Sequence, residues 1–183
     1  CQYAIVESTS HGLALNRLDH VEYDIAAFTN ITGDHLDFHK TFEAYREAKG
    51  LLFEALDTAA RKSVPKTAVV NLDDPSANYM VDRSAAAPLT YALENRDAMV
   101  SARVLELRPD GTGFQLLTPR GVVPASIQLP AIFNVMNALA AAGVAVACGM
   151  DPGEIAGGLA SCPGVPGRME RISTGQPFEV VVD

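Results

Sequence analysis

Short, continuous apolar runs alternate with helix-like stretches along the first half of the chain. They occupy residues 3–6, 24–29 and 67–72, and a shorter run occupies residues 89–92. Apolar runs without polar alternation are typical of strands buried on both faces of a parallel sheet. The sequence Asp-Asp-Pro-Ser at residues 73–76 then marks a turn and a helix start. The pattern predicts an α/β fold with a mostly parallel sheet flanked by helices.

The clearest helix is predicted over residues 41–56, where apolar residues recur at helical spacing. Thr41 is its candidate N-cap, and Lys49 lies beside the apolar stripe. The stripe consists of Tyr45, Ala48, Leu51, Leu52 and Ala55. Further helices are predicted over residues 134–148 and 151–159.

Between residues 101 and 129 the pattern changes to short strands. They are predicted over residues 101–107, 113–118 and 122–129, with Asp-Gly and Arg-Gly dipeptides between them. Such dipeptides are typical of antiparallel hairpin turns. We therefore expect residues 101–129 to form a small, three-stranded antiparallel subsheet on the flank of the main sheet.

Composition narrows the class of protein. With 183 residues, of which 48% are hydrophobic, the chain can form one domain with a substantial core. Its 22 acidic and 14 basic residues argue against nucleic acid or a membrane surface as a partner. Neither a signal peptide nor an apolar run of transmembrane length is found. Cys1, Cys148 and Cys162 form no disulfide framework, so we expect a reducing, cytoplasmic environment. Cys148 and Cys162 are expected to be buried. We also expect the protein to be a monomer.

Both ends of the sequence run into apolar stretches. The chain begins with Cys1 and enters the run at residues 3–6, and residues 178–183 form another run without a closing turn. We interpret the sequence as cut from a longer protein, in which residues 173–183 form a strand that leads toward a further domain.

The densest group of ionisable side chains follows the second predicted strand. Residues 34–39 read Asp-His-Leu-Asp-Phe-His, and residues 45–49 read Tyr-Arg-Glu-Ala-Lys. In α/β proteins, catalytic and binding groups gather at the carboxyl ends of parallel strands. Glu7 also follows a predicted strand, so Glu7, His35 and Lys49 could share one crevice. A carboxylate and an imidazole there could hold a divalent ion such as Mg²⁺.

These residues also have ordinary structural interpretations. Glu7 could cap the helix that follows it, His35 could be a hydrogen-bonded loop residue, and Lys49 could be an exposed helix residue. His35, Asp37 and His39 also resemble parts of iron or zinc sites. The Glu that follows the first His in zinc proteases is absent, however, and the expected fold does not suit the iron site. Spacing alone leaves these alternatives open.

Two segments in the second half carry polar groups suited to a nucleotide. Asn134 and Asn137 open a predicted helix, where amides can cap the helix or bind a ring edge or a phosphate. Arg168 lies in a turn that contains Pro and Gly, where it could bind an anion or pair with Glu170. The sequence contains no Gly-x-x-x-x-Gly-Lys-Ser/Thr phosphate loop.

Together these motifs resemble the central domain of the Mur ligase family, and its UDP-N-acetylmuramoyl-tripeptide synthetase branch best. The ordered motifs are residues 6–13, 28–39, 43–49, 71–74, 133–141 and 163–170. The similarity covers nearly all of residues 1–183 and implies a partial central ATP-binding domain with a P-loop-like fold. The family enzymes are ATP-dependent amide ligases of peptidoglycan synthesis. They convert the carboxylate of a UDP-MurNAc-peptide into an acyl phosphate, which an amino acid then attacks.

The resemblance also implies roles for individual residues. Glu7 and His35 would bind Mg²⁺, and Lys49 would be carbamylated by CO₂ so that it supports a second Mg²⁺. The residues implied in binding the UDP-MurNAc-peptide are Thr9, Ser10, Arg17 and Asn30. The residues implied in binding ATP are Asn134, Asn137, Arg168 and Asp183.

The sequence departs from the family pattern at three places. Residues 7–11 read Glu-Ser-Thr-Ser-His where the family usually has Glu-Val-Ser-Ser-His. Leu15 replaces a substrate-binding glutamine of some members, and Ala131-Ile132 replaces the usual Gly-Arg pair. A paralogue acting on another carboxylate (folylpolyglutamate or cyanophycin synthetase-like), or a non-catalytic binding module, is therefore an alternative. Because the phosphate loop and the C-terminal domain are absent from these 183 residues, we expect no ligase turnover from them alone, and the added amino acid stays unspecified.

Overall fold

A six-stranded sheet with strand order β1-β2-β3-β4-β5-β6 forms the centre of the molecule. The computed structural model describes residues 2–32, 36–164, 167, 170–172, 174–176, 178 and 180–182. The strands of the sheet are β1 (Ile25–Phe28), β2 (Thr67–Asn71), β3 (Ala87–Ala92), β4 (Val100–Arg108), β5 (Gly111–Thr118) and β6 (Gly121–Ile127). The helices are α1 (Ser10–Ala14), α2 (Leu36–His39), α3 (Phe42–Thr58), α4 (Ala77–Val81), α5 (Ile132–Ala147) and α6 (Pro152–Ser161).

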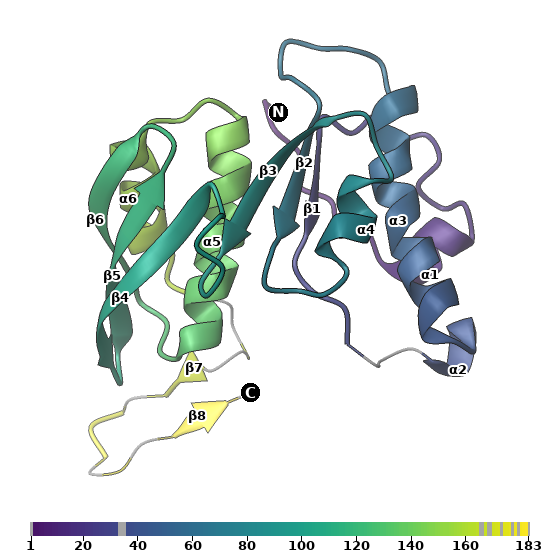
Figure 1. Ribbon diagram of the computed structural model, residues 1–183. Helices are drawn as coiled ribbons and strands as arrows, with labels where there is room; N and C mark the ends of the chain where they lie inside the picture. The colour runs from purple at the N-terminus through teal and green to yellow at the C-terminus, as the bar shows by residue number, and fades with distance from the viewer. Residues whose placement is uncertain are drawn as a thin grey trace.

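Helices cover both faces of the parallel part of the sheet, as the sequence predicts (Figure 1). Strands β1 to β4 pair in parallel; α5 packs against them on one face, and α3 and α4 pack against β1 and β2 on the other. Val69 and Val70 are adjacent in β2 and fully buried, yet they belong to separate hydrophobic clusters. Val69 shares its cluster with Leu139 of α5, and Val70 shares the other with Phe53 of α3. Successive strand side chains point to opposite faces, so a continuous apolar run fits a strand covered on both sides.

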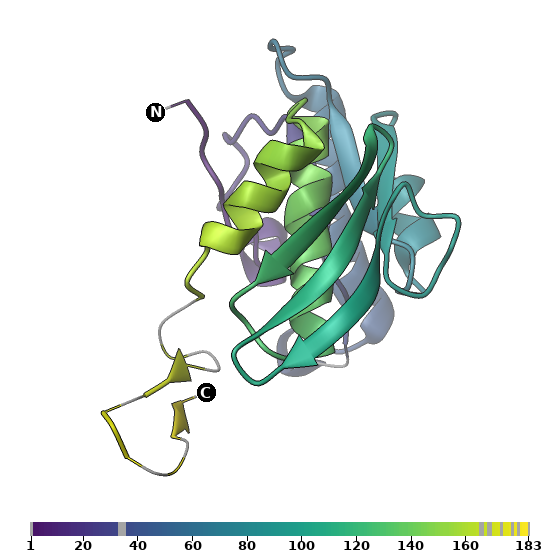
Figure 2. The same ribbon diagram turned by 90° about the vertical axis from the view of Figure 1, so that its left-hand side faces the viewer.

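The three predicted antiparallel strands of residues 101–129 are confirmed, and they continue the main sheet at its flank. Tyr91 and Ala92 of β3 pair in parallel with Val100 and Ser101 of β4, and β4, β5 and β6 then pair in antiparallel order. Strand β4 is thus the fourth strand of the parallel part of the sheet and also the first strand of the antiparallel part. Helices α5 and α6 cover one face of these strands (Figure 2).

The helix predictions are confirmed with small changes at their ends. Helix α3 begins after Thr41, whose Oγ1 accepts a hydrogen bond of 3.1 Å from the backbone N–H of Ala44. Helix α6 begins after Asp151, whose backbone N–H donates to the Glu154 carboxylate at 3.0 Å. None of the described helices combines the length and the apolar character needed to cross a bilayer.

One strand prediction fails, at the start of the chain. Residues 3–6 form no strand, and the Ile5 side chain is 99% exposed. The apolar composition of this segment does not bury it, because no described strand pairs with it. At the other end, a two-residue strand β8 (Val181–Val182) pairs antiparallel with β7 (Glu170–Arg171) and is exposed. Cys162 is likewise exposed and Cys148 half-buried, so the expectation of buried thiols is wrong for Cys162.

Candidate active site

Buried polar side chains tie the carboxyl ends of β1 and β2 together. Asn71 Nδ2 donates a hydrogen bond of 2.8 Å to the carbonyl of Thr29. Asp74 Oδ2 accepts from the backbone N–H of Ile31 at 2.9 Å, and its other oxygen accepts from the backbone N–H of Ser76 at 2.8 Å. Asp74 is buried, so these bonds lie away from solvent. The beginning of the loop after β1 is thereby fixed to the turn after β2.

Asp73 extends this network to the connection between β3 and β4. Its carboxylate accepts hydrogen bonds of 2.7, 3.1 and 2.8 Å from the backbone N–H groups of residues 93–95. The hydroxyl of Tyr91 donates to the carbonyl of Phe28 at 3.0 Å. Burial, followed by the negative charges of Asp74 and Asp73, raises the pKa of Tyr91, so this hydroxyl stays a donor. Three consecutive parallel strands therefore end in one connected polar network.

Lys49 lies on α3 and is half-buried. Its Nζ lies 5.2 Å from the centroid of the Tyr45 ring, and Tyr45 itself is buried. Burial lowers the pKa of Lys49, while the negative charge of Asp74 opposes part of that shift. Among the described residues, no carboxylate forms an ion pair with this ammonium group. The interpretation of Lys49 as an exposed helix residue is therefore wrong.

Glu7 lies in the extended segment that precedes α1, and its side chain is exposed. The N-cap of α1 is Thr9, whose Oγ1 accepts a hydrogen bond of 3.1 Å from the backbone N–H of Gly12. The alternative role of Glu7 as a helix cap is therefore wrong. Glu7 forms no ion pair with another residue in the described part of the chain, and its carboxylate is open to solvent.

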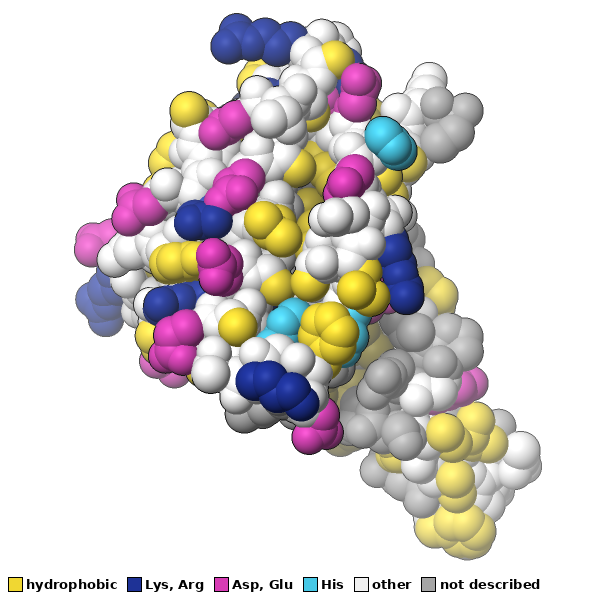
Figure 3. All heavy atoms as spheres, turned by 90° about the vertical axis from the view of Figure 1, so that its right-hand side faces the viewer, with side chains coloured by type: hydrophobic (Ala, Val, Ile, Leu, Met, Phe, Trp, Pro, Cys, Tyr) yellow, Lys and Arg dark blue, Asp and Glu magenta, His cyan; other side chains and the backbone are white. Residues whose placement is uncertain are grey.

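Ser10 and His39 form a buried pair close to Thr9. Ser10 Oγ and His39 Nε2 share a hydrogen bond of 2.9 Å, although the two residues are 29 positions apart. By contrast, Arg17 and Asn30 are exposed. Figure 3 shows the molecule from the side of α1, α2 and α3, where basic and acidic side chains are interspersed. A charged ligand on this face would thus be held by individual groups and not by one dominant field.

Asn134 and Asn137 lie in the first turns of α5. Asn134 is buried; its Nδ2 donates to the carbonyl of Pro130 at 2.6 Å, and its Oδ1 accepts from Asn137 Nδ2 at 3.3 Å. Asn137 is exposed. Before the helix, Ala131 has φ 74° and ψ 148°, a conformation that glycine adopts far more readily. In the family that the sequence resembles, glycine is usual at the position of Ala131, as the first residue of a Gly-Arg pair.

Several predicted site residues lie outside the described part of the chain. These are His35, Arg168 and Asp183, together with Asp34. Their roles, and the iron or zinc interpretations that depend on His35, stay predictions. Within the described ranges, no group of three or more His, Cys, Asp and Glu side chains could hold a metal ion.

Sequence reasoning did not single out two residues that interact with Lys49 in the structure, Asp74 and Tyr45. The sequence places Asp74 in a turn and in the 71–74 motif, and Tyr45 in an apolar stripe and in the 43–49 motif, but assigns neither a role in the site. The available signal for Asp74 was its position directly after a buried strand, the same signal that singled out Glu7 and residues 34–39.

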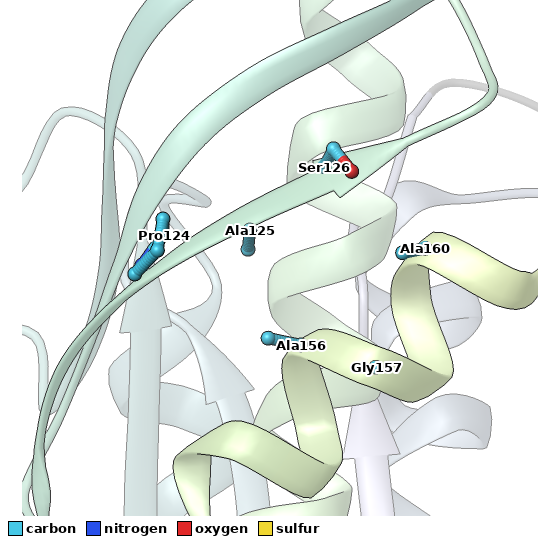
Figure 4. A pocket seen from close by; sticks show the side chains of 6 residues that line it. All are labelled: Pro124, Ala125, Ser126, Ala156, Gly157 and Ala160. Carbon is cyan, nitrogen blue, oxygen red and sulfur yellow. The ribbon is translucent and has the colours of Figure 1, made fainter.

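A separate groove of about 400 Å³ lies between β6 and α6 (Figure 4). It is lined by Pro124, Ala125, Ser126, Ala156, Gly157 and Ala160. These small side chains carry no ionisable group, and none of the candidate residues is among them. The groove therefore adds no chemistry to the site.

The chain is similar to known proteins over most of its length. Residues 1–145 match the family described as the Mur ligase middle domain. The chain is 47% identical over 180 residues to the UDP-N-acetylmuramoyl-L-alanyl-D-glutamate–2,6-diaminopimelate ligase of Bacillus velezensis. The matched residues make up 98% of this chain and 36% of that protein. The chain is also 47% identical, over 191 residues, to the UDP-N-acetylmuramyl-tripeptide synthetase of Roseiflexus sp., covering 100% of this chain and 37% of that protein.

Solved structures show the same similarity. A UDP-N-acetylmuramoyl-L-alanyl-D-glutamate–2,6-diaminopimelate ligase superposes with a TM-score of 0.79 and 33% identity, covering 91% of this chain and 34% of that chain. The chain thus spans 36–37% of the length of the two curated relatives.

Proposed function

The chain belongs to the Mur ligase family, and we propose that it forms the middle domain of an ATP-dependent ligase that joins an amino acid to a UDP-MurNAc-peptide. The observation that carries the proposal is the half-buried Lys49, which lies over Tyr45 and within the field of Asp74. Because the chain spans only part of its relatives, the activity is proposed for the whole protein.

The names of the relatives suggest the first substrates to test. The Bacillus velezensis relative is named for UDP-N-acetylmuramoyl-L-alanyl-D-glutamate and 2,6-diaminopimelate. We therefore expect the γ-phosphate of ATP to activate a carboxylate of that UDP-linked peptide, and the amine of diaminopimelate to displace the phosphate. The products are a new amide bond, ADP and inorganic phosphate, in a cytoplasmic step of peptidoglycan synthesis.

The environment of Lys49 suits its modification by CO₂. Only the neutral amine has the lone pair that attacks CO₂, and the reaction forms an N–C bond while releasing the amine proton to solvent. Burial of Lys49 lowers its pKa and so raises the fraction of neutral amine at a given pH. The resulting carbamate would carry a negative charge in place of the ammonium.

The donor atoms of the proposed ligands also suit Mg²⁺. The exposed carboxylate of Glu7 offers the oxygen ligands that this ion prefers, and His35 and the Lys49 carbamate are the further proposed ligands. Bound there, the ion would neutralise charge on the phosphates of ATP. Glu7 is kept accessible for such a role because Thr9, and not Glu7, caps α1.

The candidate substrate-binding side chains differ in how exposed they are to solvent. Thr9, Arg17 and Asn30 are exposed and remain candidates for the UDP-MurNAc-peptide, whereas Ser10 is buried against His39. Asn137 is exposed and is the better candidate for the adenine side, because Asn134 is occupied by Pro130 and Asn137. Arg168 and Asp183 complete the proposed nucleotide contacts.

The test is an assay of the full-length protein with ATP, UDP-MurNAc-L-Ala-D-Glu and a panel of amino acids that includes diaminopimelate. Wild type, Lys49→Ala and Lys62→Ala are compared, the last because Lys62 is a surface lysine paired with Asp24. We expect Lys62→Ala to match wild type and Lys49→Ala to lose at least a hundredfold in kcat. Short carboxylic acids should restore part of the Lys49→Ala activity, because they supply the missing carboxylate.

Three results would redirect the proposal. Equal activity of Lys49→Ala and wild type would remove the carbamate role. Activity on another carboxylate substrate but none on muramoyl peptides would favour a paralogue. No ATP-dependent ligation with any substrate would favour the non-catalytic binding module.

A further inference from the structure

Three segments that carry separate candidate residues meet at a buried cluster of Ser10, His39 and Tyr45. Ser10 begins α1 directly after Thr9, His39 ends α2, and Tyr45 lies one helical turn before Lys49 in α3. All three side chains are buried, with exposed fractions of 3%, 8% and 5%. Buried polar atoms are retained only when they are paired, so the geometry of this cluster is tightly constrained.

The contacts run without interruption from α1 to Lys49. His39 Nε2 and Ser10 Oγ lie 2.9 Å apart. The His39 ring stacks on the Tyr45 ring, with 5.2 Å between centroids and 23° between planes. The ammonium of Lys49 lies over that same Tyr45 ring, 5.2 Å from its centroid.

Two further rings hold the imidazole of His39 in place. Phe38 contacts it edge-on, with 4.7 Å between centroids, and His11 lies 5.4 Å from it. His39 is thus confined by aromatic rings while its Nε2 is fixed by Ser10. A side chain held this way on several sides has one accessible orientation and can transmit a fixed spacing between the elements it contacts.

We propose that His39 is a positioning residue, which fixes the Thr9 end of α1 relative to Lys49 on α3 through Ser10 and Tyr45. Its effect on ligation rests on the proposed function, whereas its effect on the surroundings of Lys49 does not. A substrate bound near Thr9 and a group on Lys49 must be aligned for phosphoryl transfer. An error of an ångström in such alignment lowers kcat strongly, while each substrate can still bind.

The activity test compares His39→Gln, Ser10→Ala and the double variant in the full-length protein. Met80→Ala serves as the matched control, because Met80 is fully buried in the same hydrophobic cluster as Tyr45 but takes no part in the contacts that join Ser10, His39, Tyr45 and Lys49. We expect His39→Gln and Ser10→Ala each to lower kcat about tenfold, with KM for ATP within twofold of wild type. The kcat of the double variant should be no lower than that of His39→Gln, because both substitutions remove the same Ser10–His39 hydrogen bond. Met80→Ala should lower the Tm yet keep kcat per folded molecule.

A second measurement does not depend on ligation. Brief labelling with acetic anhydride, followed by peptide mapping, gives the reaction rate of Lys49 relative to the surface lysine Lys62. We expect His39→Gln to raise this ratio at least threefold, because the Tyr45 ring is released, and Met80→Ala to leave it unchanged. This readout stays informative even when the full-length protein ligates none of the substrates, so the two proposals can fail separately.

Either of two results would overturn the inference. One is an unchanged Lys49 labelling ratio in His39→Gln at the same folded fraction. The other is an active wild type in which the kcat losses of Ser10→Ala and His39→Gln multiply in the double variant.

Discussion

Asp74 and Ile31 are joined by a hydrogen bond of 2.9 Å from the Ile31 backbone N–H to the Asp74 carboxylate, across 43 positions of sequence. The other Asp74 oxygen accepts from the backbone N–H of Ser76. Charge-assisted bonds of this kind are stronger than bonds between neutral groups. The same carboxylate opposes the lowering of the Lys49 pKa. One buried side chain therefore orders the loop after β1 and influences the charge of Lys49.

Asp74→Ala should destabilise the chain by about 2–4 kcal/mol, because it leaves two buried N–H groups without an acceptor. Asp74→Asn keeps one carbonyl oxygen as an acceptor and should cost about half as much, of the order of 1–2 kcal/mol. Urea-induced unfolding of the two variants and wild type measures the difference. Equal stability of Asp74→Ala and wild type would show that the Ile31 bond contributes nothing net.

The Asp74 bond also illustrates what a sequence pattern can and cannot predict. Strand β2 and the turn after it were predicted because apolar runs and Asp-Pro signals act between neighbours in the chain. The partner of Asp74 depends on β1 lying beside β2, which no local pattern encodes. The same limit applies to Ser10 and His39, whose pairing requires α1 and α2 to meet.

At residues 3–6 the sequence pattern predicts a buried strand that the structure does not contain. Their apolar pattern equals that of β1 and β2, yet Ile5 is almost fully exposed. Local composition reports a preference for burial, whereas burial itself needs neighbouring strands and covering helices. Lys49 was singled out as a site candidate through its motif, whereas its half-buried state depends on α3 packing beside the strand ends.

Ala131→Gly should stabilise the chain by about 1 kcal/mol. At φ 74° and ψ 148°, a residue with a Cβ is strained by about 1–3 kcal/mol, and the added freedom of glycine in the unfolded chain offsets only part of that. Ala141→Gly is the matched control, because Ala141 is exposed within α5 and should lose about 1 kcal/mol on substitution. Urea midpoints of the two variants should move in opposite directions. Parallel destabilisation would mean that Ala131 carries no strain.

Two helical glycines should respond oppositely to alanine. A Cβ at Gly143 of α5 would lie 2.8 Å from Val69 Cγ1, so Gly143→Ala should destabilise by about 1–3 kcal/mol through overpacking. A Cβ at Gly157 of α6 would meet no atom within 4 Å, so Gly157→Ala should stabilise by about 0.5–1 kcal/mol through helix propensity. Thermal unfolding of both variants checks this. A stable Gly143→Ala would mean that α5 can move away from β2 at little cost.

Asp24 should make stability depend on pH in the acidic range. Burial acts to raise the pKa of its carboxyl, but hydrogen bonds and charge from Lys66 at 3.0 Å and Lys62 at 3.1 Å outweigh burial and lower it. Between the lowered folded pKa and the unfolded value of about 3.9, the unfolded chain binds more protons, so stability rises with pH. The stabilisation is therefore complete above about pH 5 and is lost as pH falls through the folded pKa.

Asp24→Asn should consequently cost about 0.5–1 kcal/mol at pH 7, as expected for a partly exposed ion pair. The difference from wild type should shrink as the pH is lowered below 4, where the wild-type carboxyl also becomes neutral. Urea unfolding of both proteins at several pH values measures this convergence. In a Lys66→Ala background the Asp24→Asn difference should be smaller at pH 7, because Lys66 is the stronger of the two partners. A difference that stays constant from pH 7 to pH 3 would mean that Asp24 stabilises the fold through packing and not through its charge.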